Sequence, residues 1–153
     1  MRQLLKAALL IAAGVALGGY LFRDVQPRSF LALPDCGDSC YRPSDLAGLL
    51  VSAGIQTVPA ALPLVLRETD RCMTIQHPFP SFKHHFVVFP KRDIKDIASI
   101  AVEDGPVVME CFEHMRWLVA RHNLSRYRVE TNGAGLQHVT YLHFHLVSNE
   151  GTQ

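Results

Sequence analysis

Hydrophobic residues at the start of the chain form one unbroken run. Arg2 and Lys6 are followed by 16 residues without charge, from Ala7 to Phe22. A positive start before an apolar run is the pattern of a secretory signal sequence, whereas a membrane-spanning helix needs about 20 apolar residues. The run is short for a membrane span and long for a cleaved signal. Residues 1–22 are therefore predicted to be either a signal-anchor or a cleaved signal peptide.

In residues 23–60, hydrophobic and polar residues follow each other less regularly. This segment is predicted to be a tether with one short helix. Residues 23–43 contain three prolines. The helix is expected within SDLAGLLVSAG, where Ser44 is a suitable N-cap, apolar residues recur at helical spacing, and Gly54 is a stop signal.

Residues 61–153 have the pattern of a separate domain, in which apolar runs alternate with polar turns. β-branched and aromatic runs bounded by turn residues predict strands, here at residues 64–67, 72–75, 84–90, 127–131 and 138–147. A polar turn at residues 68–71 joins the first two strands.

Two helices are predicted between the third and the fourth strand. Asp93 is a candidate cap for a short helix through Ala101, and Pro106 suits the first turn of a longer one. The longer helix has one apolar stripe at helical spacing, formed by Val107, Val108, Cys111, Phe112, Met115, Leu118 and Val119. Too few helices connect the strands for a doubly wound parallel sheet. The pattern predicts an α+β fold, an antiparallel sheet of about five strands with two helices.

Composition and charge restrict the class of partner. The 153 residues are 48% hydrophobic with a formal net charge of +1, so a nucleic-acid partner, which a basic face would attract, is not expected. The flank before residues 7–22 is the more positive one, and such flanks stay cytoplasmic. The body of the protein is therefore predicted to be membrane-anchored or secreted, on the non-cytoplasmic side.

The four cysteines occur in two kinds of surroundings. Cys36 and Cys40 lie in the polar stretch DCGDSC, where a small disulfide ring fits an oxidising compartment. The alternative is half of a zinc site, although such sites usually have two residues between the cysteines and here there are three. Cys72 and Cys111 lie in apolar segments and are predicted to be buried, inert thiols.

Candidate chemistry is concentrated in LQHVTYLHFHLV, residues 136–147. Side chains alternate between the faces of a strand, so Tyr141, His143 and His145 share one face and the apolar residues between them face the core. Three interpretations follow. The histidines are hydrogen-bonded surface residues, or they bind zinc with His85 as third ligand, or one of them is a nucleophile toward phosphorus.

The same stretch resembles the signature of the histidine triad (HIT) superfamily. In that signature a strand carries three histidines at alternate positions, with a glutamine four positions before the first. Gln137 has this spacing to Tyr141, which occupies the first triad position. VLRETDRCMTI, HHFVVFPKRDI and NGAG resemble further blocks of the superfamily, so the resemblance covers roughly residues 64–147.

The resemblance implies a reaction that needs neither a metal nor a cofactor. Members are mostly nucleotide hydrolases or transferases. The middle histidine of the triad, here His143, attacks phosphorus and forms a covalent phosphohistidine, while His145 and His85 line the phosphate. The residues expected to contact the nucleotide are Asn132, Gln137, His77 and Ile75.

Three residues depart from the family pattern. Tyr141 replaces a histidine, but its backbone carbonyl can still orient the nucleophile, and its phenol is expected to donate to an oxyanion. His138 stands where the family has Ser or Thr and is expected to protonate the leaving group. His77 replaces an Asp that holds the ribose hydroxyls, and an imidazole does not reproduce that paired acceptor.

These departures and the N-terminal anchor leave two alternatives to a nucleotide hydrolase. One is a lipid-nucleotide hydrolase similar to CDP-diacylglycerol pyrophosphatases, which resemble the same fold and carry an N-terminal anchor. The other is a nucleotide-binding module whose catalysis is weakened by Tyr141. A homodimer that pairs through the long helix, with Met109 and Trp117 at the contact, is a further expectation.

Overall fold

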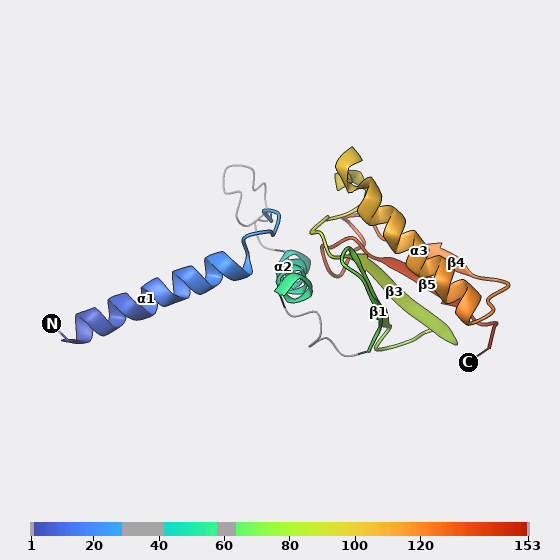
Figure 1. Ribbon diagram of the computed structural model, residues 1–153, viewed down its shortest axis with the longest axis horizontal. Coiled ribbons are helices and arrows are strands. Elements are labelled where there is room, and N and C mark those ends of the chain that lie inside the picture. Colours follow the sequence, from blue (N-terminus) through green and yellow to red (C-terminus); the bar gives the residue numbers. More distant parts are fainter. Residues whose placement is uncertain (1, 29–41, 58–63, 153) are drawn as a thin grey trace.

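The computed structural model describes residues 2–28, 42–57 and 64–152. Figure 1 shows an N-terminal helix that extends away from a body built of one sheet and its helices. The helices are α1 (Arg2–Leu21), α2 (Pro43–Thr57) and α3 (Gly105–Arg121), and the strands are β1 (Val65–Glu68), β2 (Cys72–Gln76), β3 (His84–Pro90), β4 (Arg128–Glu130) and β5 (Phe144–Ser148).

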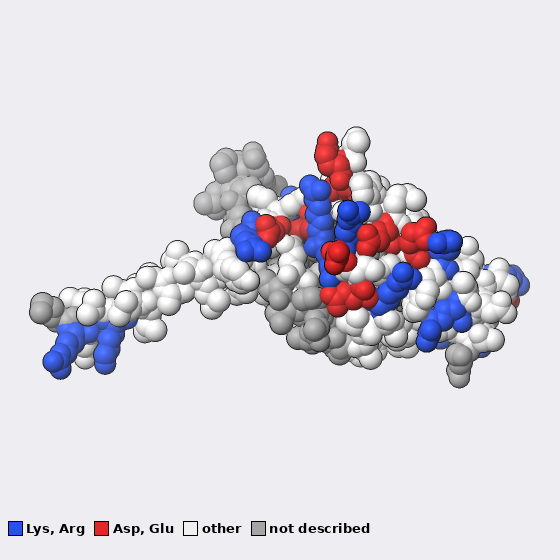
Figure 2. Space-filling model, viewed as in Figure 1, with Lys and Arg blue, Asp and Glu red and all other residues white. Residues whose placement is uncertain are grey.

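Helix α1 has the length and composition of a membrane-spanning helix. It has 20 residues and a mean hydropathy of 1.9, and none of its described residues is buried. In Figure 2, basic side chains mark its first turns and an uncharged surface follows. A signal sequence near an N-terminus has the same properties, so the helix fits both an anchor and a signal peptide.

The sheet confirms the predicted α+β class. Its five strands have the order β1-β2-β3-β5-β4, and every neighbouring pair is antiparallel. β3 lies at the centre with all of its residues buried. In the register of β3 and β5, Val87 is opposite His145 and His85 is opposite Val147, so the strand that carries His85 lies beside the strand that carries His145.

Helices α3 and α2 pack against opposite faces of the sheet. Alternate residues of β3 fall into two apolar clusters, as the alternation of side chains requires. The cluster with Phe86 includes Leu118 of α3, and the cluster with Phe89 includes Ile55 of α2 and Tyr141. Most of the predicted apolar stripe of α3 therefore faces the core, although Phe112 is 45% exposed. The histidine face of the sheet is the one that α2 covers.

The last strand is shorter than predicted. β5 begins at Phe144, and the preceding residues 138–143 are bends and loop. The N–H of Thr140 donates to the carbonyl of Ser44 at 3.0 Å, and the N–H of Leu142 donates to the carbonyl of Ile94 at 2.6 Å. These backbone groups bond to segments outside the sheet, so the hydrogen-bond ladder of β5 begins only after them.

The helix predicted at residues 93–101 is replaced by two 3₁₀ turns. These are η4 (Ile97–Ser99), which Asp96 caps, and η5 (Val102–Asp104). Asp93 does not cap either of them, because its carboxylate forms a buried ion pair with Arg28, 2.8 Å away.

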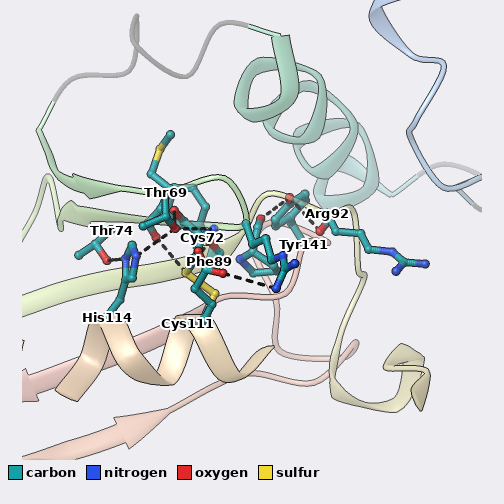
Figure 3. Close-up of a disulfide and its surroundings, with 12 residues drawn as sticks. Thr69, Cys72, Thr74, Phe89, Arg92, Cys111, His114 and Tyr141 are labelled. Atoms are coloured by element: carbon teal, nitrogen blue, oxygen red, sulfur yellow. Dashed lines mark hydrogen bonds and ion pairs between the residues drawn. A yellow bond between two sulfur atoms is a disulfide. The ribbon is translucent and has the colours of Figure 1, made fainter. Parts of the chain in front are cut away.

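A further correction concerns the cysteines. Cys72 of β2 and Cys111 of α3, predicted to be inert thiols, are joined by a disulfide with their Cα atoms 5.4 Å apart (Figure 3). Both residues are buried, as the apolar pattern predicted, but the pattern along the chain does not show which cysteines meet in space. Cys36 and Cys40 lie outside the described residues, and their disulfide stays a prediction.

The two residues proposed for a dimer contact differ in their surroundings. Met109 is 61% exposed. Trp117 is partly buried against the core, with the guanidinium groups of Arg67 and Arg121 over its ring at 5.1 and 5.2 Å. The homodimer stays a prediction.

Candidate active site

A cavity of about 220 Å³ opens on the face of the sheet that α2 covers. Its lining comes from the sheet, the loop after β2, the loop before β5 and one residue of α2, Val51. Three of the predicted site histidines are among the lining residues, namely His77, His143 and His145. The ring centroids of His143 and His145 are 5.0 Å apart. His85 joins the group through His145, so the structure brings four histidines together.

The backbone sets the orientation of the His143 ring. Its Nδ1 lies 2.7 Å from the carbonyl oxygen of Tyr141. A carbonyl only accepts hydrogen bonds, so Nδ1 carries the proton and Nε2 keeps its lone pair. Burial lowers the pKa of His143, which favours this neutral form. The arrangement makes Nε2 of His143 a ready nucleophile.

A chain of hydrogen bonds sets the protons of His85 and His145. The N–H of Ser81 donates to Nδ1 of His85 at 3.3 Å, so in the neutral ring the proton is on Nε2. That N–H faces Nδ1 of His145 at 3.0 Å, which must accept. His145 therefore carries its own proton on Nε2, as a donor. Burial, followed by the charges of His143, His85 and His77, lowers the pKa of His145 to about 4.

The His77 ring stacks on one member of the hydrogen-bonded pair of His85 and His145. Its ring lies parallel to that of His85 with centroids 4.0 Å apart, and its Nδ1 accepts the N–H of Phe79 at 3.1 Å. The neutral His77 ring is thus also a donor through Nε2. An imidazole has no pair of carboxylate oxygens to hold the hydroxyls of a ribose, as expected for a histidine at the position where the family has an Asp.

The same imidazoles are the candidate ligands for a metal ion. His77, His85 and His145 each offer a nitrogen, and these atoms lie within 4.8 Å of one another, which suits the imidazole ligands that zinc accepts. However, the nitrogens of His85 and His145 already bond to each other. An ion held by these two facing nitrogens would have to replace that hydrogen bond and displace the proton from Nε2 of His85.

Tyr141 departs from its expected role. Its hydroxyl lies 2.6 Å from the carbonyl of Pro90 and 3.1 Å from that of Arg92 (Figure 3). A phenol has one proton to donate, so this hydroxyl is committed to the backbone, and the predicted hydrogen bond to an oxyanion is wrong. Burial raises the pKa of Tyr141 and keeps that proton in place. The Tyr141 carbonyl, in contrast, contacts His143 as expected.

Gln137 acts on the backbone around the site. Its side-chain amide is buried and donates to the carbonyl of Lys95 at 3.0 Å and, more weakly, to that of Tyr141 at 3.5 Å. It therefore steadies the carbonyl that orients His143. Of the other residues predicted to contact substrate, Ile75 lines the cavity.

His138 and Asn132 are not among the residues that line this cavity. His138 is exposed, and Asn132 is partly buried. The structure therefore does not bring them to His143, and their roles rest on the sequence resemblance alone.

Residues before the predicted domain also hold the loop that carries Tyr141 and His143, a contact that the sequence did not predict. The guanidinium of Arg28 bonds both carboxylate oxygens of Asp93, at 3.0 and 2.8 Å, and the carbonyl of Thr140 at 3.0 Å. The hydroxyl of Thr140 donates to Asp45 of α2 at 2.7 Å. Thr140 directly precedes Tyr141, so the N-terminal segment and α2 together fix the loop that positions His143. Nothing in the local pattern around Arg28 signals such a contact.

Comparisons with known proteins bear on the family and the fold of this chain. The model of the family described as "Scavenger mRNA decapping enzyme C-term binding" matches residues 58–153. Similar solved structures include a HIT family hydrolase from Legionella pneumophila, with 21% identity and a TM-score of 0.57, covering 65% of this chain and 93% of that one. A HIT family hydrolase from Clostridium thermocellum has 22% identity and a TM-score of 0.56, covering 65% of this chain and 92% of that one.

A histidine triad protein from Clostridium difficile is similar to the same extent. It has 19% identity and a TM-score of 0.56, covering 65% of this chain and 90% of that one. Identities this low bear on the fold alone. No curated protein matches.

Proposed function

The chain belongs to the scavenger mRNA decapping enzyme C-terminal family and has the histidine triad fold, and from this premise we propose that it hydrolyses or transfers a nucleotide or nucleotide-like phosphoester through a covalent intermediate on His143. The observation that carries the proposal is the 2.7 Å contact from His143 Nδ1 to the Tyr141 carbonyl. It leaves the Nε2 lone pair on the cavity side of a neutral ring.

The proposed reaction has two displacements. The Nε2 lone pair of His143 attacks phosphorus, a P–N bond forms, the bond from phosphorus to the leaving group breaks, and the leaving group takes a proton. Water or another acceptor then attacks the same phosphorus, and the P–N bond breaks to return neutral His143. Splitting one difficult displacement into two easier ones is the usual benefit of a covalent intermediate.

Charge on the non-bridging oxygens is met by N–H donors. We assign this role to the Nε2–H groups of His145 and His77, which are oriented by the hydrogen bonds described above. Fixed donors aimed at developing charge contribute a large part of catalysis in such sites. His85 acts through His145 as a positioning residue. His138 is kept as the proposed acid for the leaving group on the sequence resemblance alone.

The test is covalent labelling of the full-length protein with a fluorophosphate nucleotide, read by mass spectrometry of peptides. We expect the label on His143 and neither label nor turnover in His143→Ala, while His145→Ala keeps the nucleophile and loses about 10²–10³-fold in turnover. His122→Ala is the matched control, because His122 lies outside the cavity lining. Activity that is abolished by EDTA and restored by zinc would overturn the mechanism, since a metal-bound water rather than His143 would then be the nucleophile.

A binding module without turnover is the second candidate. The observation that favours it is the Tyr141 hydroxyl, which bonds to the backbone and leaves the first triad position without a donor in the cavity. In that case nucleotides bind with similar affinity in the wild type and in His143→Ala, and no label forms on either protein.

A further inference from the structure

A second cavity, of about 350 Å³, adjoins the histidine cavity. The two share four lining residues, Val51, Ile75, Pro78 and Phe89. The two cavities therefore adjoin at these residues, and the histidines line only the first. Their sizes together fall within the ordinary range for a small-molecule site.

Among the residues that the structure describes, the lining of the second cavity offers no polar side chain to a ligand. Apart from the shared residues and Gly54, its described lining consists of Leu50, Ile55 and Leu64. A nucleoside placed here would lose water from its base and ribose without gaining partners, and each unpaired buried polar group costs about 1–3 kcal/mol. An alkyl chain meets no such penalty.

We propose, building on the function proposed above, that this apolar cavity holds the alkyl chain of an amphiphilic phosphoester drawn from a membrane, with its phosphate at the histidines. Three observations point the same way. The cavity adjoins the one that His143 lines, its described lining is hydrocarbon, and His77 offers no paired acceptor for a ribose. Helix α1, long and apolar enough to span a bilayer, would hold the domain near that source.

The proposal makes Val51 a specificity residue. Val51 lies on α2, lines both cavities and is 38% exposed, so a polar residue can replace it without being buried. Leu46 on the same helix is 36% exposed and lines neither cavity. Val51→Asp and Leu46→Asp therefore add the same charge to the same helix at similar exposure, inside and outside the proposed site.

The experiment measures binding of methyl-, butyl- and octylphosphonate to the full chain in phosphatidylcholine nanodiscs by titration calorimetry, with empty nanodiscs as the reference. We expect affinity to rise about four-fold for each buried methylene, so that octylphosphonate binds at least about 10²-fold more tightly than methylphosphonate. Val51→Asp should remove most of this dependence on chain length, Val51→Thr a smaller part, and Leu46→Asp none.

Equal affinities for methyl- and octylphosphonate would overturn the proposal. So would adenosine 5′-monophosphate binding more tightly than octylphosphonate in both the wild type and Val51→Asp. The two proposals fail separately. A label on His143 without dependence on chain length removes the alkyl subsite and keeps the phosphohistidine, whereas dependence on chain length without a label removes the phosphohistidine and keeps the subsite.

Discussion

At the scale of single residues, hydrogen-bond direction decides the chemistry of the site. Carbonyl oxygens only accept and backbone N–H groups only donate, and these fixed partners set the proton on each ring. The Tyr141 carbonyl places the His143 proton on Nδ1, and the N–H of Ser81 sets the protons of His85 and then His145. The result is one lone pair and several N–H donors in a single cavity.

Tyr141 is the residue whose replacement separates catalysis from structure. Tyr141→Phe removes the hydroxyl that bonds the carbonyls of Pro90 and Arg92 but keeps the Tyr141 carbonyl. It should therefore lower the free energy of unfolding by about 1–3 kcal/mol and leave turnover within a few-fold. Tyr141→His restores the family triad and should hold or raise turnover. Urea unfolding and steady-state kinetics measure the two effects, and a 10²-fold loss of turnover in Tyr141→Phe at unchanged KM would contradict this division.

The histidine pKa values predict how stability depends on pH. An unfolded histidine takes up its proton near pH 6.5, whereas folded His145 does so only at about 4. Between these values the unfolded state binds more protons, so the free energy of unfolding should fall as the pH is lowered from 6.5 toward 4. Burial lowers the pKa of His143 and His85 as well, which adds to the same slope.

Urea unfolding at several pH values measures this dependence, with His145→Gln as the comparison. The variant should show a shallower loss of stability between pH 6.5 and 4 than the wild type. Identical slopes would mean that His145 is not held neutral by its surroundings.

At the scale of elements, the site depends on how α2 docks onto the loop before β5. Gly48 marks the closest approach, because a Cβ there would overlap the carbonyl oxygen of Thr140. The contacts of Thr140 with Ser44 and Asp45 lie at the start of the same helix, and Arg28 holds the Thr140 carbonyl from the other side. Any displacement of α2 is therefore passed to the segment that orients His143.

Gly48→Ala tests this coupling. The added methyl group must push α2 and residues 138–143 apart, so we expect about a ten-fold or greater loss of kcat/KM, since a misplacement of about 1 Å can cost 10²-fold. Gly105→Ala is the control, because a Cβ at Gly105 meets no atom within 4 Å. Equal activity in the two variants would show that α2 does not position the nucleophile.

At the scale of the whole molecule, the disulfide and α1 both give information on the cellular compartment in which the body of the protein lies. The Cys72–Cys111 bond ties α3 to β2 in the core, and disulfides persist in oxidising compartments. An apolar N-terminal helix that could be an anchor or a signal sequence fits the same compartment. Both observations favour the predicted position of the body on the non-cytoplasmic side.

Removing the disulfide should cost a large part of the stability. Its cysteines are 39 residues apart, and closing a loop of that length is worth about 4 kcal/mol in the chain-entropy description. In a Cys36→Ser/Cys40→Ser background, reductant should lower the urea midpoint by the corresponding amount. The further change Cys72→Ala/Cys111→Ala should abolish the response to reductant, and an unchanged midpoint in the background protein would contradict a structural role.

The sequence alone determined the features that depend on local periodicity. The stripe of α3, the hairpin of β1 and β2 and the buried run of β3 followed from apolar spacing. His143 and His145 were predicted to share a face because strand side chains alternate, and both line the same cavity although His143 lies just before β5. Covalent geometry and solvent act on each short segment in the same way wherever it lies, so these features can be read from neighbouring residues.

Tertiary structure decided everything that depends on a partner distant in the chain. It paired Cys72 with Cys111, directed the Tyr141 hydroxyl to Pro90 rather than to a phosphate, and began β5 only at Phe144. It also brought α2, predicted as part of a tether, to the wall of the histidine cavity. The physical reason is that a donor, a thiol or an apolar surface is satisfied by whichever group the fold brings within reach, and that group is fixed only when the whole chain has folded.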